Sequence, residues 1–360
     1  MITDSPISVV IDRSQVADPT HGAVECIEIR PGADRSLPLV LFLPGGGGSA
    51  ESLLALQPVV GELWQSGRLP ACRIVTPSVD PWGFYLDDPP RGYAWESFIR
   101  ERLLPTLQAP GGGQSGSQPT GLLGISMGGY GALKIAFAQP HHVRAVAAVS
   151  PMLEPALCVA DVRPRNRYHY PPQVPAALLG NQRDAALYAA DHPAGRAHRQ
   201  ADDLRASALA IYLDAAADDA LHAQDGAEFL HRVLWELDLP HDYHLVAAAD
   251  HLGPSLVPRI EAAFTWLGAQ LAPPLLADSP LEQAWRSYLD EGATSAPPVT
   301  PLPPTSPLAP RLLRHLLASQ HAAAATEDDT MSRRLGRLPC PLAAETSSAV
   351  PPAAHPRNGV

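Results

Sequence analysis

The sequence predicts an α/β protein with a mostly parallel central β-sheet and helices on both faces. Short, continuously apolar runs such as residues 37–43 alternate with longer amphipathic stretches along most of the chain. Continuous apolar runs are typical of strands buried on both faces of a sheet, and their alternation with helices predicts βαβ units. The chain has 360 residues, 46% of them hydrophobic, which is enough for one large domain with a sizeable core.

The individual elements follow from apolar periodicity and from turn residues. Two early strands, at 7–11 and 23–29, flank a turn at 18–22 that contains proline and glycine. Further strands are expected at 37–43, 72–76, 120–125, 143–149, 208–213 and 242–248. Helices are expected at 50–66, 93–108, 127–138, 221–238 and 255–271.

One internal segment departs from this alternation. Residues 151–206 carry many proline, arginine and tyrosine residues, and only short helices are expected there, near 175–179 and 184–190. The strand and helix pattern resumes after it. We therefore interpret the segment as a small cap inserted over the sheet.

The composition changes again after about residue 272, where proline, alanine, serine and threonine dominate. Such a segment buries too little apolar surface to offset the entropy of ordering it. We therefore expect a globular domain over 1–272 and a largely disordered tail over 273–360. Short helices are expected near 280–290 and 307–322, and the apolar and basic face of the second could contact a partner or a membrane surface.

Composition also argues against several classes of function. The formal net charge is −11, lysine is nearly absent and the arginines are scattered, so no nucleic-acid partner is expected. The four cysteines form no Cys-x-x-Cys pair, which favours free thiols over a metal site; they are Cys26, Cys72, Cys158 and Cys340. No secretory signal pattern and no transmembrane-length apolar run occurs, so a cytoplasmic protein without a transmembrane segment is expected.

The most specific motif is Gly124-Ile125-Ser126-Met127-Gly128, which follows an apolar run and opens a helical one. In that context Gly-x-Ser-x-Gly forms a sharp strand-to-helix turn, in which the two glycines prevent clashes between neighbouring segments. The turn exposes the serine hydroxyl at a helix N-terminus, whose dipole favours developing negative charge. The motif predicts an α/β-hydrolase fold with Ser126 as the catalytic nucleophile.

A second motif lies directly after the strand at 37–43, where Pro44 is followed by four glycines, Gly45 to Gly48. Acyl transfer needs preorganised N–H donors for the oxyanion. We expect these donors to be the N–H groups of Met127, next to the nucleophile, and of Gly46 in the glycine loop. A phosphate-binding loop is the rival interpretation, but the run lacks the Gly-Lys-Ser/Thr ending.

The base and the acid of a triad should follow the nucleophile in the order Ser, Asp or Glu, His. The strand at 208–213 is followed by Asp214, Asp218 and Asp219. Either Asp218 or Asp219 could be the acid that orients the base, and their positions do not decide between them. Asp214 closes the strand and is better placed to hold the loop. His251 lies on a short loop before the last helix, which is where the general base belongs.

These runs resemble the putative-esterase group of α/β-hydrolases, which includes S-formylglutathione hydrolases, enterochelin-type esterases, feruloyl esterases and mycolyltransferases. The resemblance covers about 37–270, and its most specific piece is the run from Ser126 to Leu133. It implies Asp219 as the triad acid, because the acid of that group follows the strand-ending aspartate by five residues. The chain departs from the group at Pro44, where the group has histidine, and at Ala216, where it has glycine.

These observations predict a serine esterase that hydrolyses small-molecule carboxylic esters through an acyl-enzyme, without a metal or organic cofactor. Two alternatives stay open: an acyltransferase that uses the same triad with an alcohol or amine acceptor, and a non-catalytic binding protein of the same fold. Four side chains are expected to contact substrate, namely Trp82, Tyr85, Arg165 and Tyr168.

Overall fold

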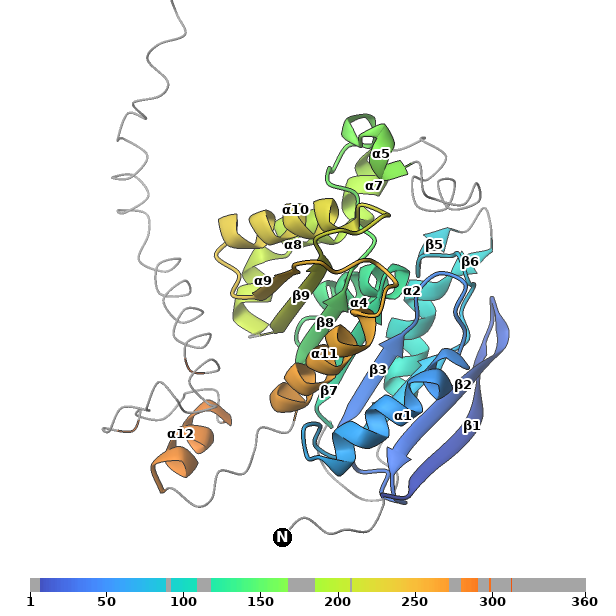
Figure 1. The fold of residues 1–360 in the computed structure, drawn as a ribbon, viewed down its shortest axis with the longest axis vertical. Helices are drawn as coiled ribbons and strands as arrows, with labels where there is room; N and C mark the ends of the chain where they lie inside the picture. Colours follow the sequence, from blue (N-terminus) through green and yellow to red (C-terminus); the bar gives the residue numbers. More distant parts are fainter. Residues whose placement is uncertain are drawn as a thin grey trace, which may run out of the picture.

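The centre of the computed structural model is an eight-stranded β-sheet (Figure 1). The structure describes residues 7–88, 92–108, 118–167, 185–207, 209–271 and 280–290, with Pro298 and Leu312. The strands are β1 (Val9–Asp18), β2 (Gly22–Pro31), β3 (Leu39–Leu43), β4 (Arg73–Pro77), β7 (Thr120–Ile125), β8 (Ala145–Val149), β9 (Ala210–Ala216) and β10 (Asp242–Val246). Their order is β1-β2-β4-β3-β7-β8-β9-β10. Only the β1–β2 and β2–β4 pairs are antiparallel, which confirms the mostly parallel sheet.

Helices cover both faces of this sheet (Figure 1). The four long ones are α1 (Ser52–Gln65), α4 (Met127–Ala138), α10 (Ala223–Glu236) and α11 (Leu256–Leu271). Side chains of α1 and α11 belong to one hydrophobic cluster, and side chains of α4 and α10 belong to another. The two clusters are the cores on the two sides of the sheet, as expected for strands buried on both faces.

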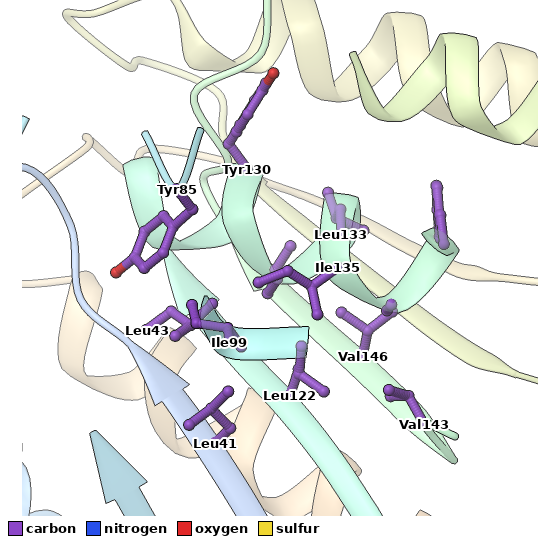
Figure 2. Close-up of a cluster of buried hydrophobic side chains, with 14 of the residues drawn as sticks. Leu41, Leu43, Tyr85, Ile99, Leu122, Tyr130, Leu133, Ile135, Val143 and Val146 are labelled. Carbon is purple, nitrogen blue, oxygen red and sulfur yellow. The ribbon is translucent and has the colours of Figure 1, made fainter. Parts of the chain in front are cut away.

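Strand β3 shows how one apolar run supplies both cores. Leu41 and Leu43 pack in the same cluster as Leu133 of α4 (Figure 2). Val40 and Phe42 point to the other side and join the cluster of α1 and α11. Successive side chains alternate across a strand, so an uninterrupted apolar run is what a strand between two helical layers requires.

The region expected as a single helix over 93–108 is more divided. Residues Tyr93–Ala94 form strand β6, which pairs with β5 (Asp87–Asp88) in a small second sheet. The helical part comprises α2 (Trp95–Phe98), a π-helical turn (Ile99–Leu103) and α3 (Leu104–Gln108). The helix therefore begins two residues later than expected, because backbone pairing with β5 holds its first residues extended.

In the segment between β8 and β9, the described residues 150–167, 185–207 and 209 include short helices. They are α5 (Pro164–Arg167), α7 (Ala185–Asp191), α8 (Pro193–Arg199) and α9 (Ala201–Ser207), after a 3₁₀ turn at Val159–Asp161. Helix α7 matches the helix expected near 184–190, whereas the one expected near 175–179 lies outside the described residues. In the tail, α12 (Pro280–Asp290) matches the expectation, and 307–322 lies outside the described residues except for Leu312.

A buried ionic cluster joins this segment to the rest of the domain. Lys134 of α4 is fully buried, and its ammonium lies 3.0 Å from Glu96 and 2.6 Å from Asp191. Arg196 of α8 contacts the same two carboxylates, at 2.7 Å from Glu96 Oε2 and 3.0 Å from Asp191 Oδ1. Two cations and two carboxylates thus meet at the junction of α2, α4, α7 and α8, and Arg100 adds a third cation 3.3 Å from Glu96 Oε1.

Two expectations from composition bear on the described residues. Cys26 and Cys72 are buried free thiols and Cys158 is an exposed one, while Cys340 lies outside the described residues. Within the described ranges, no helix combines the length and the apolar character that crossing a bilayer requires.

Candidate active site

Ser126 lies in the turn between β7 and α4, as the motif predicts. Its backbone angles are φ 56° and ψ −118°, a conformation that a non-glycine residue adopts only under strain. Three hydrogen bonds hold it there: its N–H donates to the Val149 carbonyl at 2.9 Å, and its carbonyl accepts from Tyr130 at 3.1 Å and Met152 at 3.0 Å.

The flanking glycines are required by close packing. A Cβ atom on Gly124 would lie 2.0 Å from the Gly128 carbonyl oxygen, and one on Gly128 would lie 1.9 Å from the Leu43 carbonyl oxygen. Both distances are far inside van der Waals contact, and the obstructing atoms are backbone. Neither position therefore accepts any other residue without moving a strand or the helix.

The structure brings Ser126, His251 and Asp219 together. His251 Nε2 lies 2.9 Å from Ser126 Oγ, and His251 Nδ1 lies 2.7 Å from Asp219 Oδ2. An ionised carboxylate only accepts hydrogen bonds, so the neutral imidazole carries its proton on Nδ1 and its Nε2 accepts from the serine hydroxyl. His251 is 3% exposed and Asp219 is 2% exposed, which shields this chain of hydrogen bonds from water.

The structure separates the three aspartates that follow β9. Asp219 is buried, and its second oxygen accepts from the Leu221 N–H at 2.8 Å. Asp218 is exposed, and its carboxylate makes no hydrogen bond or ion pair with another described residue. Asp214 is buried against Arg259 of α11, whose Nε donates to it at 2.7 Å. Only Asp219 reaches the imidazole.

The glycine loop passes beside the serine. A Cβ atom on Gly45 would lie 3.3 Å from Ser126 Cβ, so the backbone of the loop directly faces the turn that carries Ser126. The N–H of Gly47 donates to the Pro81 carbonyl at 2.8 Å and that of Gly48 to the Gly45 carbonyl at 3.0 Å. Within the described residues, the N–H of Gly46 donates to no backbone carbonyl. The N–H of Met127, which is the first residue of α4, donates to no backbone carbonyl outside that helix.

The side chains expected to contact substrate have different surroundings. Trp82 is half-buried and covers the glycine loop, so that a Cβ atom on Gly46 would lie 2.5 Å from its ring. Arg165 pairs with Asp225 at 2.6 Å beside a cavity of about 530 Å³, and none of Ser126, Asp219 and His251 lines that cavity. Tyr168 lies outside the described residues.

Tyr85 requires a correction. Its side chain is fully buried, so it presents no surface to a substrate. The ring packs against Gly131 of α4 in the cluster of Figure 2, and the hydroxyl donates to the Pro44 carbonyl at 2.9 Å. The aromatic residue expected to contact substrate therefore holds the start of the glycine loop against helix α4.

Two residues near Ser126, His251 and Asp219 were not singled out from the sequence. Asp250 precedes His251, and its carboxylate accepts from the N–H groups of Ala220 and His251. Arg259 donates to the Asp250 carbonyl at 3.2 Å. An aspartate in a loop often accepts backbone hydrogen bonds, so the loop position of Asp250 was a sequence feature that could have indicated these contacts. Arg259 lies in a helical stretch, and no feature of that stretch indicated its contact.

The comparison with protein-family models gives one match, to the family described as Putative esterase, over residues 35–251. The match covers more than half of the chain and includes the glycine loop and all three residues of the hydrogen-bonded chain. This protein belongs to that esterase family. It is accordingly an enzyme that acts as a carboxylic ester hydrolase.

Solved structures of this fold include several esterases. A ferulic acid esterase is 18% identical, with a TM-score of 0.56 over 73% of this chain and 98% of its own. A fluorophosphonate-binding serine hydrolase of Staphylococcus aureus is 16% identical, with a TM-score of 0.57 over 73% and 99%. An S-formylglutathione hydrolase of Agrobacterium tumefaciens is 16% identical, with a TM-score of 0.56 over 74% and 96%. At these identities the likeness shows the α/β-hydrolase fold. No curated protein sequence matches the chain.

Metal chemistry is a separate question. Across the part of the chain that the structure describes, no three histidine, cysteine, aspartate or glutamate side chains are grouped so that they could hold a metal ion. A hydrogen-bonded chain such as that of Ser126, His251 and Asp219 can activate a serine hydroxyl for attack on a carbonyl.

Proposed function

We propose that this esterase cleaves its substrate through a Ser126–His251–Asp219 triad and an acyl-enzyme. The observation that carries the proposal is the continuous chain of hydrogen bonds, 2.9 Å from serine to imidazole and 2.7 Å from imidazole to carboxylate. His251 takes the proton of the Ser126 hydroxyl as Oγ attacks the ester carbonyl. It then passes that proton to the leaving alcohol. Asp219 keeps the Nδ1–H tautomer and stabilises the imidazolium that forms.

The second half of the reaction uses the same groups. A water molecule takes the place of the alcohol, His251 removes its proton, and the oxygen attacks the acyl carbonyl on Ser126. Collapse of the tetrahedral intermediate returns the proton to Ser126 Oγ and releases the carboxylic acid. The products are therefore one alcohol and one acid for each ester and water consumed.

Both tetrahedral intermediates need donors for the oxyanion, and we assign the N–H groups of Met127 and Gly46. Met127 is the first residue of α4, where backbone N–H groups have no partner inside the helix. Gly46 lies in the loop whose backbone faces Ser126, and its N–H makes no other backbone hydrogen bond within the described residues. Trp82, which covers this loop, is the side chain that we place against the substrate.

A fluorophosphonate probe tests the role of Ser126. We expect the wild-type protein to form one covalent adduct, mapped by mass spectrometry to the peptide that carries Ser126. Ser126→Ala should not be labelled and should lose turnover of p-nitrophenyl esters. Ser207→Ala is a matched control because Ser207, whose hydroxyl bonds the Leu204 carbonyl at the end of α9, lies outside this site. Labelling of Ser126→Ala at the wild-type rate would contradict the proposal.

A further inference from the structure

Asp250 joins the two loops that carry the acid and the base. Its Oδ1 atom accepts from the Ala220 N–H at 3.0 Å and from the His251 N–H at 2.6 Å. Ala220 directly follows Asp219 in the chain. The dipeptides 219–220 and 250–251 are therefore connected twice, once by the bond from His251 Nδ1 to Asp219 Oδ2 and once by the bond from the Ala220 N–H to Asp250 Oδ1.

The side chain of Asp250 continues a ladder of backbone hydrogen bonds. The N–H of Ala217 donates to the Val246 carbonyl and that of Asp218 to the Ala249 carbonyl, both at 2.9 Å. These bonds hold the two loops together up to the residue before the triad acid. At Ala220 the acceptor is no longer a carbonyl but the Asp250 carboxylate. The last bond of the ladder thus depends on one side chain.

The charge of Asp250 strengthens this contact. Its side chain faces solvent, and the hydrogen bonds from the Ala220 and His251 backbone lower the pKa of its carboxyl. The group is therefore ionised at neutral pH, and hydrogen bonds to an ionised acceptor are shorter and stronger than neutral ones. A local turn would explain the bond to the neighbouring His251 N–H, but the bond to Ala220 spans 30 residues of sequence.

We propose that Asp250 is a positioning residue of this esterase, whose carboxylate fixes the distance between the loop of Asp219 and the loop of His251. The inference rests on the proposed triad. Without the contact at Ala220, the described hydrogen bonds that run from the backbone next to Asp219 to the loop of His251 are reduced to that of the Asp218 N–H, and the carboxylate and the imidazole lose their fixed separation. Small displacements of catalytic groups reduce the rate of the chemical step more than they reduce substrate binding.

Two substitutions separate the effect of losing the hydrogen-bond acceptor of Asp250 from the effect of losing its charge. Asp250→Asn keeps an oxygen that can accept both N–H groups, whereas Asp250→Ala removes it. We expect Asp250→Ala to lower kcat on a p-nitrophenyl ester by about 10- to 100-fold, with KM within about twofold of wild type. Asp250→Asn should restore most of kcat. Asp218→Ala, which removes an exposed carboxylate from the same pair of loops, is the matched control and should keep the wild-type kcat.

A spectroscopic measurement distinguishes positioning from general stability. The proton shared by His251 Nδ1 and Asp219 should give a far-downfield ¹H NMR signal in the wild type and in Asp250→Asn. We expect it to broaden or vanish in Asp250→Ala at a temperature where circular dichroism shows the variant folded. If Asp250→Ala is not recovered folded, Asp250→Ser serves in its place, because its shorter side chain cannot reach both N–H groups.

The outcomes are distinct. A wild-type kcat and an unchanged downfield signal in Asp250→Ala would overturn the positioning role, and so would an Asp250→Asn variant as impaired as Asp250→Ala. A wild-type protein that neither turns over esters nor is labelled at Ser126 would overturn the proposed triad, and the role of Asp250 with it. The wild-type measurement thus separates failure of the triad from failure of this inference.

Discussion

Ser126 carries the backbone strain of the site and, in the proposed mechanism, its chemistry. A serine held at φ 56° costs on the order of 1–3 kcal/mol relative to a relaxed conformation. The fold tolerates this strain for two reasons. Gly124 and Gly128 allow the strand, the turn and the helix to approach closely. Backbone groups of Val149, Tyr130 and Met152 also form hydrogen bonds with the turn. The strained turn projects the hydroxyl toward His251 and leaves the N–H of Met127 beside it.

Asp219 supplies a second test at the scale of single residues. Asp219→Asn keeps the size of the side chain but presents an amide that can donate to His251 Nδ1, which favours the wrong imidazole tautomer. We expect kcat on a p-nitrophenyl ester to fall by about 10³- to 10⁴-fold, as an equivalent change does in a serine protease triad. Thermal unfolding of the same samples checks that the variant is folded.

Asp218→Asn is the paired control for that experiment, because Asp218 is exposed and neighbours Asp219. It should keep kcat within about twofold of wild type, since most surface substitutions change little. A silent Asp219→Asn together with a strongly impaired Asp218→Asn would transfer the role of the acid to Asp218.

At the scale of single residues, the sequence predicted which side chains lie together where a local pattern specifies their position. Ser126 and His251 were expected from a strand-to-helix motif and from a loop position, and the structure places them 2.9 Å apart. The pattern could not assign Tyr85, because an aromatic residue with a hydroxyl suits a substrate pocket and a core equally well. Its burial depends on Gly131, which lies 46 positions further along the chain.

The elements around the site are held by charge as well as by apolar packing. Lys134 of α4, Glu96 of α2, Asp191 of α7 and Arg196 of α8 form one buried cluster. Burial alone would raise the pKa of Glu96, but the neighbouring cations Lys134 and Arg196 lower it to about 2. The ionised form of Glu96 therefore stabilises the fold above its ordinary pKa, and that stabilisation is lost as the pH falls toward 2.

Removing one member of this cluster should be costly. Lys134→Met keeps the length of the side chain but leaves Glu96 and Asp191 without the buried ammonium. We expect the free energy of unfolding to fall by about 3–5 kcal/mol, measured by urea denaturation at pH 7. Arg232→Met, which breaks an exposed pair with Glu228, should cost less than about 1 kcal/mol. Equal losses of unfolding free energy in Lys134→Met and Arg232→Met would show that the buried cluster stabilises the fold no more than an exposed ion pair does.

The expected elements were found where apolar periodicity is strong. Strands β3, β7 and β8 and helices α4 and α11 lie within about two residues of their expected bounds. The pair β5 and β6 was missed, because two-residue strands have no periodicity and depend on a partner. The ionic cluster was missed for a related reason: its members lie on four elements, and no sequence spacing relates Lys134 to Glu96 and Asp191.

At the scale of the whole molecule, the topology assembles the site. Strands β7 and β9 and the loop after β10 deliver Ser126, Asp219 and His251 to the same end of the sheet, although 125 residues separate the first from the last. Parallel strands place their carboxyl ends together. The positions of these residues after successive strands therefore indicated, before any distance was known, that they lie close to one another. Residues 151–206 gave no such guidance, because they follow no regular period.

The central claim is that Ser126 carries the acyl group during turnover. The most direct measurement mixes the wild-type protein with a p-nitrophenyl ester whose acyl group is released slowly, quenches it in acid within the burst of p-nitrophenol, and maps the adduct by peptide mass spectrometry. We expect one acyl group per active protein, on the peptide that contains Ser126, and none in Ser126→Ala. Ester turnover at an undiminished rate in Ser126→Ala, or an acyl group found on another residue, would contradict the account.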